Sequence, residues 1–473
     1  MKKIFTLAVL ALTLAACNKQ DIQPVEQNDG MITLSATLAP KGAATKALSD
    51  NGDGKLKAEW DENEELAILY EVGGTKKYTS ATVKSVDASG AATIEFTVES
   101  GTAEGTACTV VYPASLVGGD PAFDVSSNAA LIGNQPGTLD AKLDVRVTTG
   151  SISPGDPSAG LVLDTPLAPK YAIVKFSLKN SDDGAITANS LAVTIGTEAF
   201  VATPASAASE FYLALPAVSD GTLIFSVPGN EGTSSYRSSK AITKNIEAGK
   251  YYRSTVLMTV QSDNADYIPM GDCGNWALKN VGAEFPADYG DYFAWGETDP
   301  YYISQSPLIW RSRKSGYSWG NYGFATDGGS TFTKYTGSDY AVLQPDDDAA
   351  TQSTDWGSPW RMPTNEEWKA LLETSDFTWA WVENFNGSGK NGRLVISRKS
   401  GFVGNCIFLP AAGYRGGVSL SNTGSNGFYW SSSLITGYPD FACELGFDPV
   451  NADSEGGGER CCGQSVRPVQ NVE

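Results

Sequence analysis

The sequence contains no histidine among its 473 residues. This absence excludes catalytic triads and dyads that use an imidazole base, and it excludes zinc sites built on histidine. Any enzyme in this chain would have to use carboxylates, cysteine, lysine or tyrosine. The missing histidine therefore leaves little catalytic chemistry within reach.

Basic residues are scarce as well, since 34 lysines and arginines stand against 54 aspartates and glutamates, a net charge of −20. Because no basic stripe exists, nucleic acid and anionic membrane surfaces are poor candidate partners. The 50 glycines, the low charged fraction of 19% and the frequent β-branched and aromatic runs favour a secreted, β-rich protein. The length suggests about three domains.

Only seven cysteines occur, and five of them follow residue 270. Five is an odd number, so at least one of these thiols is free or pairs elsewhere, and the connectivity cannot be deduced from spacing. We expect one or two structural disulfides or buried thiols. The adjacent Cys461 and Cys462 leave a second interpretation open, binding of a soft metal or redox chemistry, although redox motifs usually have the C-x-x-C spacing.

The apolar run Ile4–Ala16 near the N-terminus is too short to span a bilayer permanently. It ends in Leu14-Ala15-Ala16-Cys17, which resembles the lipobox of bacterial lipoproteins. The resemblance implies that residues 1–17 are a lipoprotein signal peptide with Cys17 lipidated, so that acyl chains anchor the protein. Asn18 is compatible with sorting to the outer membrane, and residues 18–30 are expected to be a flexible tether. We expect a lipid-anchored outer-membrane protein at the cell surface.

Residues 31–260 contain many short apolar segments separated by Asn-Gly, Asp-Gly, Gly-Gly and Pro turns. This spacing is typical of β-sandwiches. The predicted strands are Ile32–Ala36, Glu65–Tyr70, Ala92–Val98, Thr109–Tyr112, Tyr171–Leu178, Leu191–Ile195, Phe211–Leu215, Leu223–Val227 and Tyr252–Thr259.

Four motifs lie at the two ends of this region: Thr45-Lys46-Ala47, Trp60-Asp61, Glu65–Tyr70 and, at the closing strand, Ile246–Tyr252. Together they resemble the motifs of fimbrillin-like (type V pilin-like) lipoproteins. The resemblance implies two tandem β-sandwiches, residues 31–155 and 156–262. It also implies proteolytic processing at Lys46, after which the donor strand of another fimbrial subunit would fill the opened groove by strand addition.

The tryptophan distribution marks a further domain, because ten of the 11 tryptophans follow Asp263. The polar stretch Gln261–Asp266 is a plausible linker. Thr364 can N-cap a helix in which Glu367 completes a capping box, and Trp368 lies on the apolar face of that helix. We expect a mixed α+β domain over residues 266–470.

Six motifs follow one another in this region: Tyr292–Thr298, Pro345–Ala350, Trp360–Trp368, Leu409–Arg415, Tyr429–Ser432 and Gly463–Val469. In this order they resemble the motifs of secreted domains with the C-type-lectin-like fold. The same fold serves formylglycine-generating (sulfatase-modifying) enzymes and the variable, ligand-binding proteins of diversity-generating systems. The expected fold class is therefore mainly β with a mixed α+β C-terminal domain, two tandem β-sandwiches followed by a C-type-lectin-like fold.

In the ligand-binding members the loops matching residues 415–464 vary while the strands stay fixed. Here these loops are rich in Asn, Ser, Gly and aromatic residues, the adaptable contact set of paratopes. Tyr429 alternates with Trp430, so one of the two is expected to face outward. The candidate ligand-binding residues are Tyr414, Arg415, Asn422, Asn426, Tyr429, Asp440, Asn451 and Arg460. The candidates for a structural Ca²⁺ ion, the only cofactor considered for the binding role, are Asp346, Asp347 and Asp348.

These features predict a non-enzymatic surface lipoprotein for adhesion or ligand binding, with a glycan or protein partner on another surface and a place as fimbrial tip or accessory subunit. Two alternatives stay open. One is a sulfatase-modifying-like oxidase that uses copper at Cys461 and Cys462, although adjacent cysteines are not expected to direct both sulfurs easily at one ion. The other is a purely structural pilus subunit.

Overall fold

The structure is a computed structural model that describes residues 31–41, 59–229, 233–262, 266–305, 308–310 and 314–471. Cys17 and Lys46 lie outside these ranges. The described residues form 32 strands but only two α-helices, so the predicted mainly β class is confirmed. None of the helices in these ranges is both long and apolar enough to cross a lipid bilayer.

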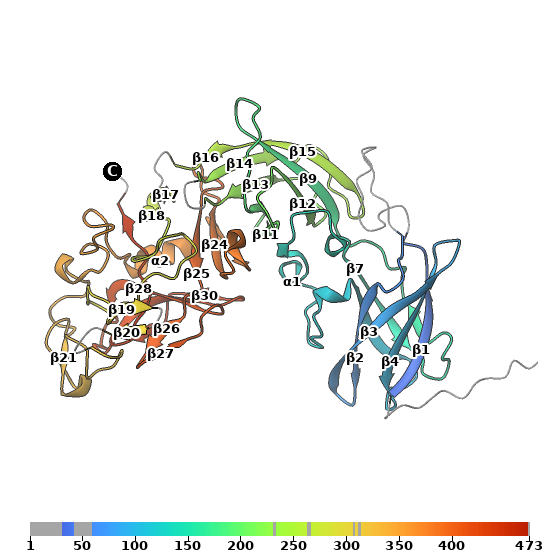
Figure 1. Cartoon of the computed structure of the whole chain (residues 1–473), viewed down its shortest axis with the longest axis horizontal. Coiled ribbons are helices and arrows are strands. Elements are labelled where there is room, and N and C mark those ends of the chain that lie inside the picture. Colours follow the sequence, from blue (N-terminus) through green and yellow to red (C-terminus); the bar gives the residue numbers. More distant parts are fainter. Residues whose placement is uncertain are drawn as a thin grey trace, which may run out of the picture.

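Three units follow one another along the chain and form an arch in Figure 1. The first, in blue, and the last, in orange and red, flank the second, in green. Neighbouring units share buried apolar residues: Ala67 and Val111 of the first sheet belong to the core of the second unit. The units are therefore packed against one another rather than strung on open linkers.

The first unit is a single seven-stranded sheet in the order β1-β4-β3-β2-β5-β7-β8. The main-chain N–H of Ser35 in β1 donates to Pro157 O at 2.7 Å, and that of Gly160 donates to Ser35 O at 2.9 Å. The sheet thus curls until its first strand meets the segment before its last, and the predicted two-layer sandwich is here one curled sheet around its own core. The strands are β1 Met31–Leu38, β2 Glu65–Val72, β3 Thr75–Val86, β4 Ala92–Glu99, β5 Thr106–Tyr112, β7 Arg146–Ile152 and β8 Leu161–Leu163.

The second unit is a sandwich of a six-stranded sheet, β16-β14-β13-β10-β11-β6, and a three-stranded sheet, β12-β9-β15. Phe176 and Phe225 meet edge to face between the sheets, with ring centroids 5.0 Å apart. The strands are β6 Asn134–Gln135, β9 Ala172–Lys179, β10 Leu191–Ile195, β11 Glu198–Ala202, β12 Glu210–Leu215, β13 Thr222–Val227, β14 Tyr236–Ala241, β15 Tyr251–Leu257 and β16 Thr259–Val260; the helix α1 spans Asn128–Ile132.

The strand pairing does not separate the first and second units at the predicted boundary between residues 155 and 156. Strand β6 precedes that boundary but pairs with β11 of the second unit, whereas β8 follows it but pairs with β7 of the first. The two units are therefore interleaved along the sequence, since each is completed by a short strand that lies across the boundary.

The third unit, residues 266–471, is called the head. Its second strand, β18, pairs with both its first strand, β17, and its last, β32, with Trp276 opposite Val469, so the chain enters and leaves at one sheet. The capping box predicted on Thr364 and Glu367 is present at the start of α2. The larger elements are β17 Tyr267–Pro269, β18 Asn275–Ala277, α2 Asn365–Leu372, β23 Phe377–Val382, β24 Gly392–Ser397, β25 Cys406–Pro410, β26 Tyr414–Gly416, β27 Ser419–Ser421, β28 Gly427–Leu434, β29 Phe441–Phe447 and β32 Val469–Gln470. The short ones are β19 Tyr302–Gln305, β20 Leu308–Trp310, β21 Ala325–Thr326, β22 Thr331–Phe332, β30 Ala452–Asp453 and β31 Gly457–Glu459.

The sheet β23-β24-β25 of the head packs on the six-stranded sheet of the second unit. Val201 and Ile224 share a core with Leu394 and others of the head. Gln261, predicted to begin a linker, is buried here: its amide nitrogen donates to Tyr236 O at 2.7 Å, and its amide oxygen accepts the N–H of Cys406 at 2.9 Å. The head is therefore held in a fixed orientation on the second unit.

Candidate functional site

The central strand of the head, β28, is buried on both faces. Tyr429 packs in the core that contains Trp368 and Val469, whereas Trp430 packs in a second core with Trp295 and Val466. Both side chains are 0% exposed. The prediction that one of them faces outward is wrong, because a strand between two cores has no solvent face.

Arg460 is also 0% exposed, so it is a structural residue and not the predicted ligand contact. Its guanidinium donates to the Tyr322 hydroxyl at 2.9 Å and to the main-chain oxygens of Tyr335 at 3.0 Å, Pro439 at 2.6 Å and Lys334 at 3.2 Å. Its planar fork thus joins two loops, residues 333–343 and 435–440, that no extended strand pairing holds together.

Arg415 is likewise buried, at 4% exposure, against the rings of Tyr292 and Tyr302. The guanidinium carbon lies 5.0 and 5.1 Å from the two ring centroids. This position gives Arg415 a cation–π role inside the head and removes it from the candidate ligand contacts.

The two loops joined by Arg460 carry an exposed apolar group, called here the tyrosine patch: Tyr340, Val342 and Tyr438. Their exposed fractions are 46%, 40% and 63%. Val342 bridges to Ser433 at the end of β28, and the Leu434 N–H donates to Ala341 O at 2.9 Å, so the loops adjoin. Residues 333–343 follow β22, which pairs with β21 at the end of the head away from β11, and residues 435–440 follow β28 (Figure 1).

Sequence reasoning missed the tyrosine patch. A signal was present in Gly437-Tyr438-Pro439, where flanking turn residues leave a tyrosine no strand or helix in which to bury itself. Tyr340 carried no comparable signal, since its exposure follows from the bridge between Val342 and Ser433, which joins residues 91 positions apart in sequence.

The other predicted contact residues are solvent-accessible but do not form one surface. Gly427 pairs with Phe447, so the turns carrying Asn422, Asn426 and Asn451 lie at one end of the β28–β29 hairpin. Tyr414 belongs to this end, since its ring meets Phe428 edge to face at 5.5 Å. Asp440 lies at the other end, beside the tyrosine patch. An eight-residue strand such as β28 spans about 26 Å, too far for one small ligand.

The three aspartates considered for Ca²⁺ do not converge on one point. Asp348 is buried, and its carboxylate accepts the main-chain N–H groups of Ala350 at 2.9 Å, Thr351 at 3.0 Å and Met362 at 2.8 Å. Asp347 accepts from the Tyr335 hydroxyl and from the ammonium of Lys334. Asp346 is exposed. Hydrogen-bond donors of the protein thus occupy the carboxylates of Asp347 and Asp348. These contacts stabilise the loop and do not form a calcium site.

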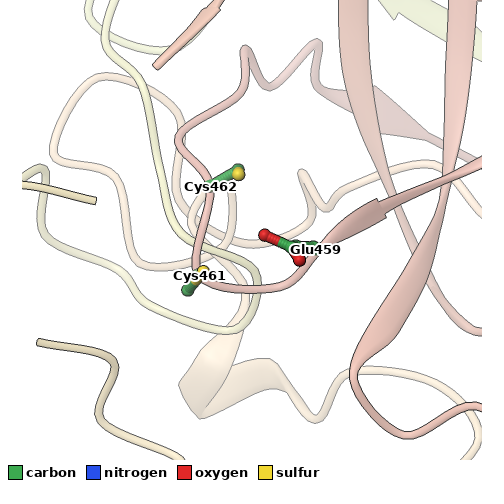
Figure 2. Close-up of side chains that lie close together, drawn as sticks. All are labelled: Glu459, Cys461 and Cys462. Atoms are coloured by element: carbon green, nitrogen blue, oxygen red, sulfur yellow. The ribbon is translucent and has the colours of Figure 1, made fainter. Parts of the chain in front are cut away.

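A different group of ligating side chains lies on the turn after β31. One oxygen of Glu459 and the sulfurs of Cys461 and Cys462 all lie within 4.8 Å of one another (Figure 2). Although the two cysteines are adjacent in sequence, their sulfurs lie close to each other and to one carboxylate oxygen. All six described cysteines are free thiols, so within the described ranges no disulfide forms.

The electrostatic setting of this turn is acidic. The interaction between the two neighbouring thiol side chains raises the pKa of Cys461 and lowers that of Cys462. On neighbouring β29, burial raises the pKa of Glu444 to about 7, although the Gln464 amide donates to its carboxylate and opposes the shift. The turn and neighbouring β29 thus bring together the buried thiol of Cys461, the half-buried thiol of Cys462 and the carboxyl groups of Glu444 and Glu459.

Comparison with known proteins bears mainly on the N-terminus. Residues 1–18 match the prokaryotic membrane lipoprotein lipid attachment site. The predicted attachment site is confirmed, and Cys17 lies within the matched residues, so the chain is a lipoprotein anchored through lipid. No curated protein matches the sequence.

Several solved structures have distant similarity to this one. A fimbrial protein from Bacteroides ovatus covers 93% of this chain and 100% of its own, at 12% identity and a TM-score of 0.23. A candidate cell adhesion protein from Bacteroides fragilis covers 49% and 95%, at 8% identity and a TM-score of 0.22. The C-terminally truncated tip fimbrial protein Mfa3 from Porphyromonas gingivalis covers 49% and 99%, at 9% and 0.20. The description of the fold therefore rests on the strand topology given above.

Proposed function

We propose that this lipoprotein is an adhesin of the outer membrane, in which the head binds a glycan or protein on another surface. In this proposal the head is a C-type-lectin-like domain, and the chain acts as a fimbrial tip or accessory subunit rather than as an enzyme. The small sheet in which β18 pairs with both the first strand, β17, and the last strand, β32, with one capped helix and long irregular loops in between, supports the assignment of that domain type.

The observation that carries the binding role is the tyrosine patch. Tyrosine rings give large, rigid contact area and a hydroxyl for hydrogen bonding, so they suit both sugar faces and peptide side chains. An exposed apolar residue is ordinary by itself, but Tyr340, Val342 and Tyr438 lie on adjoining loops held in place by buried Arg460. Such preorganisation reduces the entropy lost when a ligand binds.

The arrangement of the units supports display of the patch. The lipid attachment site is N-terminal, whereas the patch is on the last unit, and one of its loops follows the β21–β22 pair, where β21 lies away from β11 of the second unit (Figure 1). The shared core around Val201 and Leu394, together with buried Gln261, fixes the head on the second unit. A rigid arm of this kind presents a ligand site away from its anchor.

The test is binding of the mature lipoprotein, in detergent, to glycan and extracellular-matrix protein arrays. We expect at least one reproducible ligand, with the Tyr340→Ala/Tyr438→Ala double variant binding at least about tenfold more weakly, since stacked tyrosines commonly contribute about 1 kcal/mol or more each. The matched control is Val450→Ala, which removes an apolar side chain that is 80% exposed on the turn between β29 and β30.

Two outcomes would overturn the proposal. One is the absence of any ligand on both arrays, which would favour a purely structural pilus subunit. The other is a ligand whose affinity falls equally in Val450→Ala and in the double variant, because the tyrosine patch would then have no special part in binding.

A further inference from the structure

We propose that Glu459, Cys461 and Cys462 form a binding site for one thiophilic divalent metal ion of the Zn²⁺ type. The three side chains come from one turn, and Figure 2 shows a carboxylate oxygen of Glu459 on the side of the two cysteines. Within the residues that the structure describes, this is the one group of three or more cysteine and carboxylate ligands close enough to share an ion.

The spacing of the three ligand atoms fits a tetrahedral ion. Zinc binds thiolate sulfur at about 2.3 Å and carboxylate oxygen at about 2.1 Å, so two ligand atoms on one ion lie roughly 3.5–3.8 Å apart. The ligand atoms of Glu459, Cys461 and Cys462 lie within 4.8 Å of one another, and a contraction of about 1 Å would bring them to bonding positions. Rotation of the side chains of Glu459 and Cys462, which are at least partly exposed, can supply this contraction without moving the main chain.

The turn itself is already fixed. The Cys462 N–H donates to Glu459 O at 2.8 Å and closes the turn. Arg460, between the proposed ligands, is locked inside the head by its hydrogen bonds to Tyr322, Tyr335, Pro439 and Lys334. Because its main chain is held on both sides, the turn would lose little conformational freedom on binding an ion.

The charges around the turn favour a cation. Glu444 and Glu459 place carboxyl groups beside Cys462. Among the described residues no ion pair holds the carboxylate of Glu459, so it is free to act as a ligand. Three protein ligands leave a fourth position open, and because Glu459 is exposed and Cys462 only half-buried, that position faces solvent. The site therefore suits an exchangeable ion with a water or an external ligand in the fourth position.

The experiment is titration of the mature lipoprotein, kept reduced with a phosphine, with Zn²⁺ alone against a chromophoric chelator. We expect one ion per chain. Cys461→Ser and Cys462→Ser should each weaken binding by at least about tenfold, and Glu459→Gln by a smaller factor, since thiolates are the stronger zinc ligands. Titration with Co²⁺ should give the near-ultraviolet thiolate-to-metal absorption in the parent chain and lose it in both serine variants.

The matched control is Cys443→Ser, because Cys443 is also a free, partly exposed cysteine of the head but lies outside the proposed group. This variant should bind Zn²⁺ like the parent chain. The proposal is overturned if the reduced protein binds no Zn²⁺, or if Cys443→Ser weakens binding as much as Cys461→Ser does. Isolation of the unreduced protein with a Cys461–Cys462 disulfide, followed by no metal uptake after reduction, would identify the pair as a redox element instead.

Discussion

The first unit and the head satisfy their buried polar groups in different ways. In the curled sheet, strand pairing supplies most main-chain partners, and the buried ionic side chains are Lys41, Asp144 and Arg146. The head has shorter strands and long loops, and it buries Glu297, Asp348, Arg393, Arg415, Arg460 and Arg467. Loops folded into a core leave carbonyls without ladder partners, and buried arginines supply up to five donors each.

The buried arginines of the head are therefore poor candidates for ligand contact. Arg393, Arg460 and Arg467 all donate to main-chain oxygens of distant segments. In an irregular domain, hydrogen bonds from a buried arginine connect segments that cross-strand hydrogen bonds would connect in a sheet. If buried arginines have this role in the head, removal of one of them should lower stability more than removal of a local helix cap does.

Arg467→Ala is expected to have the largest effect. The guanidinium donates to the Asn280 side-chain oxygen at 2.8 Å and to the main-chain oxygens of Ala277 and Phe408, both at 2.9 Å. Its loss leaves three buried acceptors unpaired and should lower the free energy of unfolding of the head by about 3–5 kcal/mol. Urea unfolding followed by tryptophan fluorescence measures this, because ten of the 11 tryptophans follow residue 263.

The matched control for Arg467→Ala is Arg253→Ala, which removes an exposed arginine of the second unit. We expect a change of at most about 0.5 kcal/mol there. If Arg467→Ala also changed the free energy of unfolding by less than about 1 kcal/mol, the idea that buried arginines replace strand pairing in the head would fail.

The same contrast limits what the sequence could predict. The segments predicted as strands between residues 31 and 260 coincide with β1, β2, β4, β5, β9, β10, β12, β13 and β15, because short runs of apolar, β-branched and aromatic residues bounded by turn residues indicate strands locally. The capping box at Thr364 was equally predictable, since its partners are three residues apart. Local patterns sufficed wherever the deciding contacts were local.

The candidate site depended on contacts between distant residues. Arg460 reaches Lys334 across 126 positions, and no pattern near Arg460 distinguishes an inward arginine from an outward one. Tyr429 and Trp430 alternate as expected for a strand, but the presence of a core on each side of β28 is a property of the whole head. The turn that begins at Glu459 lies between the local and the long-range case. Its three candidate ligands are close in sequence, but whether their ligand atoms come together depends on how the rest of the head holds the turn.

Glu444→Gln tests an ionisable group in the same head. Burial raises the pKa of Glu444 from 4.5 to about 7, so the folded head binds a proton here that the unfolded chain releases at lower pH. The associated stability is fully present below pH 4.5 and is lost as the pH rises towards about 7. Over this window the parent head should lose at most about 3 kcal/mol from this group, and Glu444→Gln should not.

The measurement for Glu444 is urea unfolding at several pH values from about 4.5 to about 7.5, with the difference between parent and variant as the readout. Other carboxylates titrate equally in both proteins and cancel. The amide oxygen introduced by Glu444→Gln can still accept from the Gln464 amide, so the local hydrogen bond is retained. A constant difference across the whole range would mean that Glu444 titrates normally.

Thr364→Ala should have the smallest effect, because it removes a local contact of the regular kind. The Thr364 hydroxyl accepts the main-chain N–H of Glu367 at 3.3 Å, and the Glu367 carboxylate accepts the N–H of Thr364 at 2.8 Å. Loss of an N-cap side chain typically costs about 1 kcal/mol. Thr364→Ser should restore most of the stability and Thr374→Ala, at an exposed position after α2, should change little. If Thr364→Ala proved as damaging as Arg467→Ala, the start of α2 would be as important to the head as its buried arginines, and the contrast between local and long-range support would disappear.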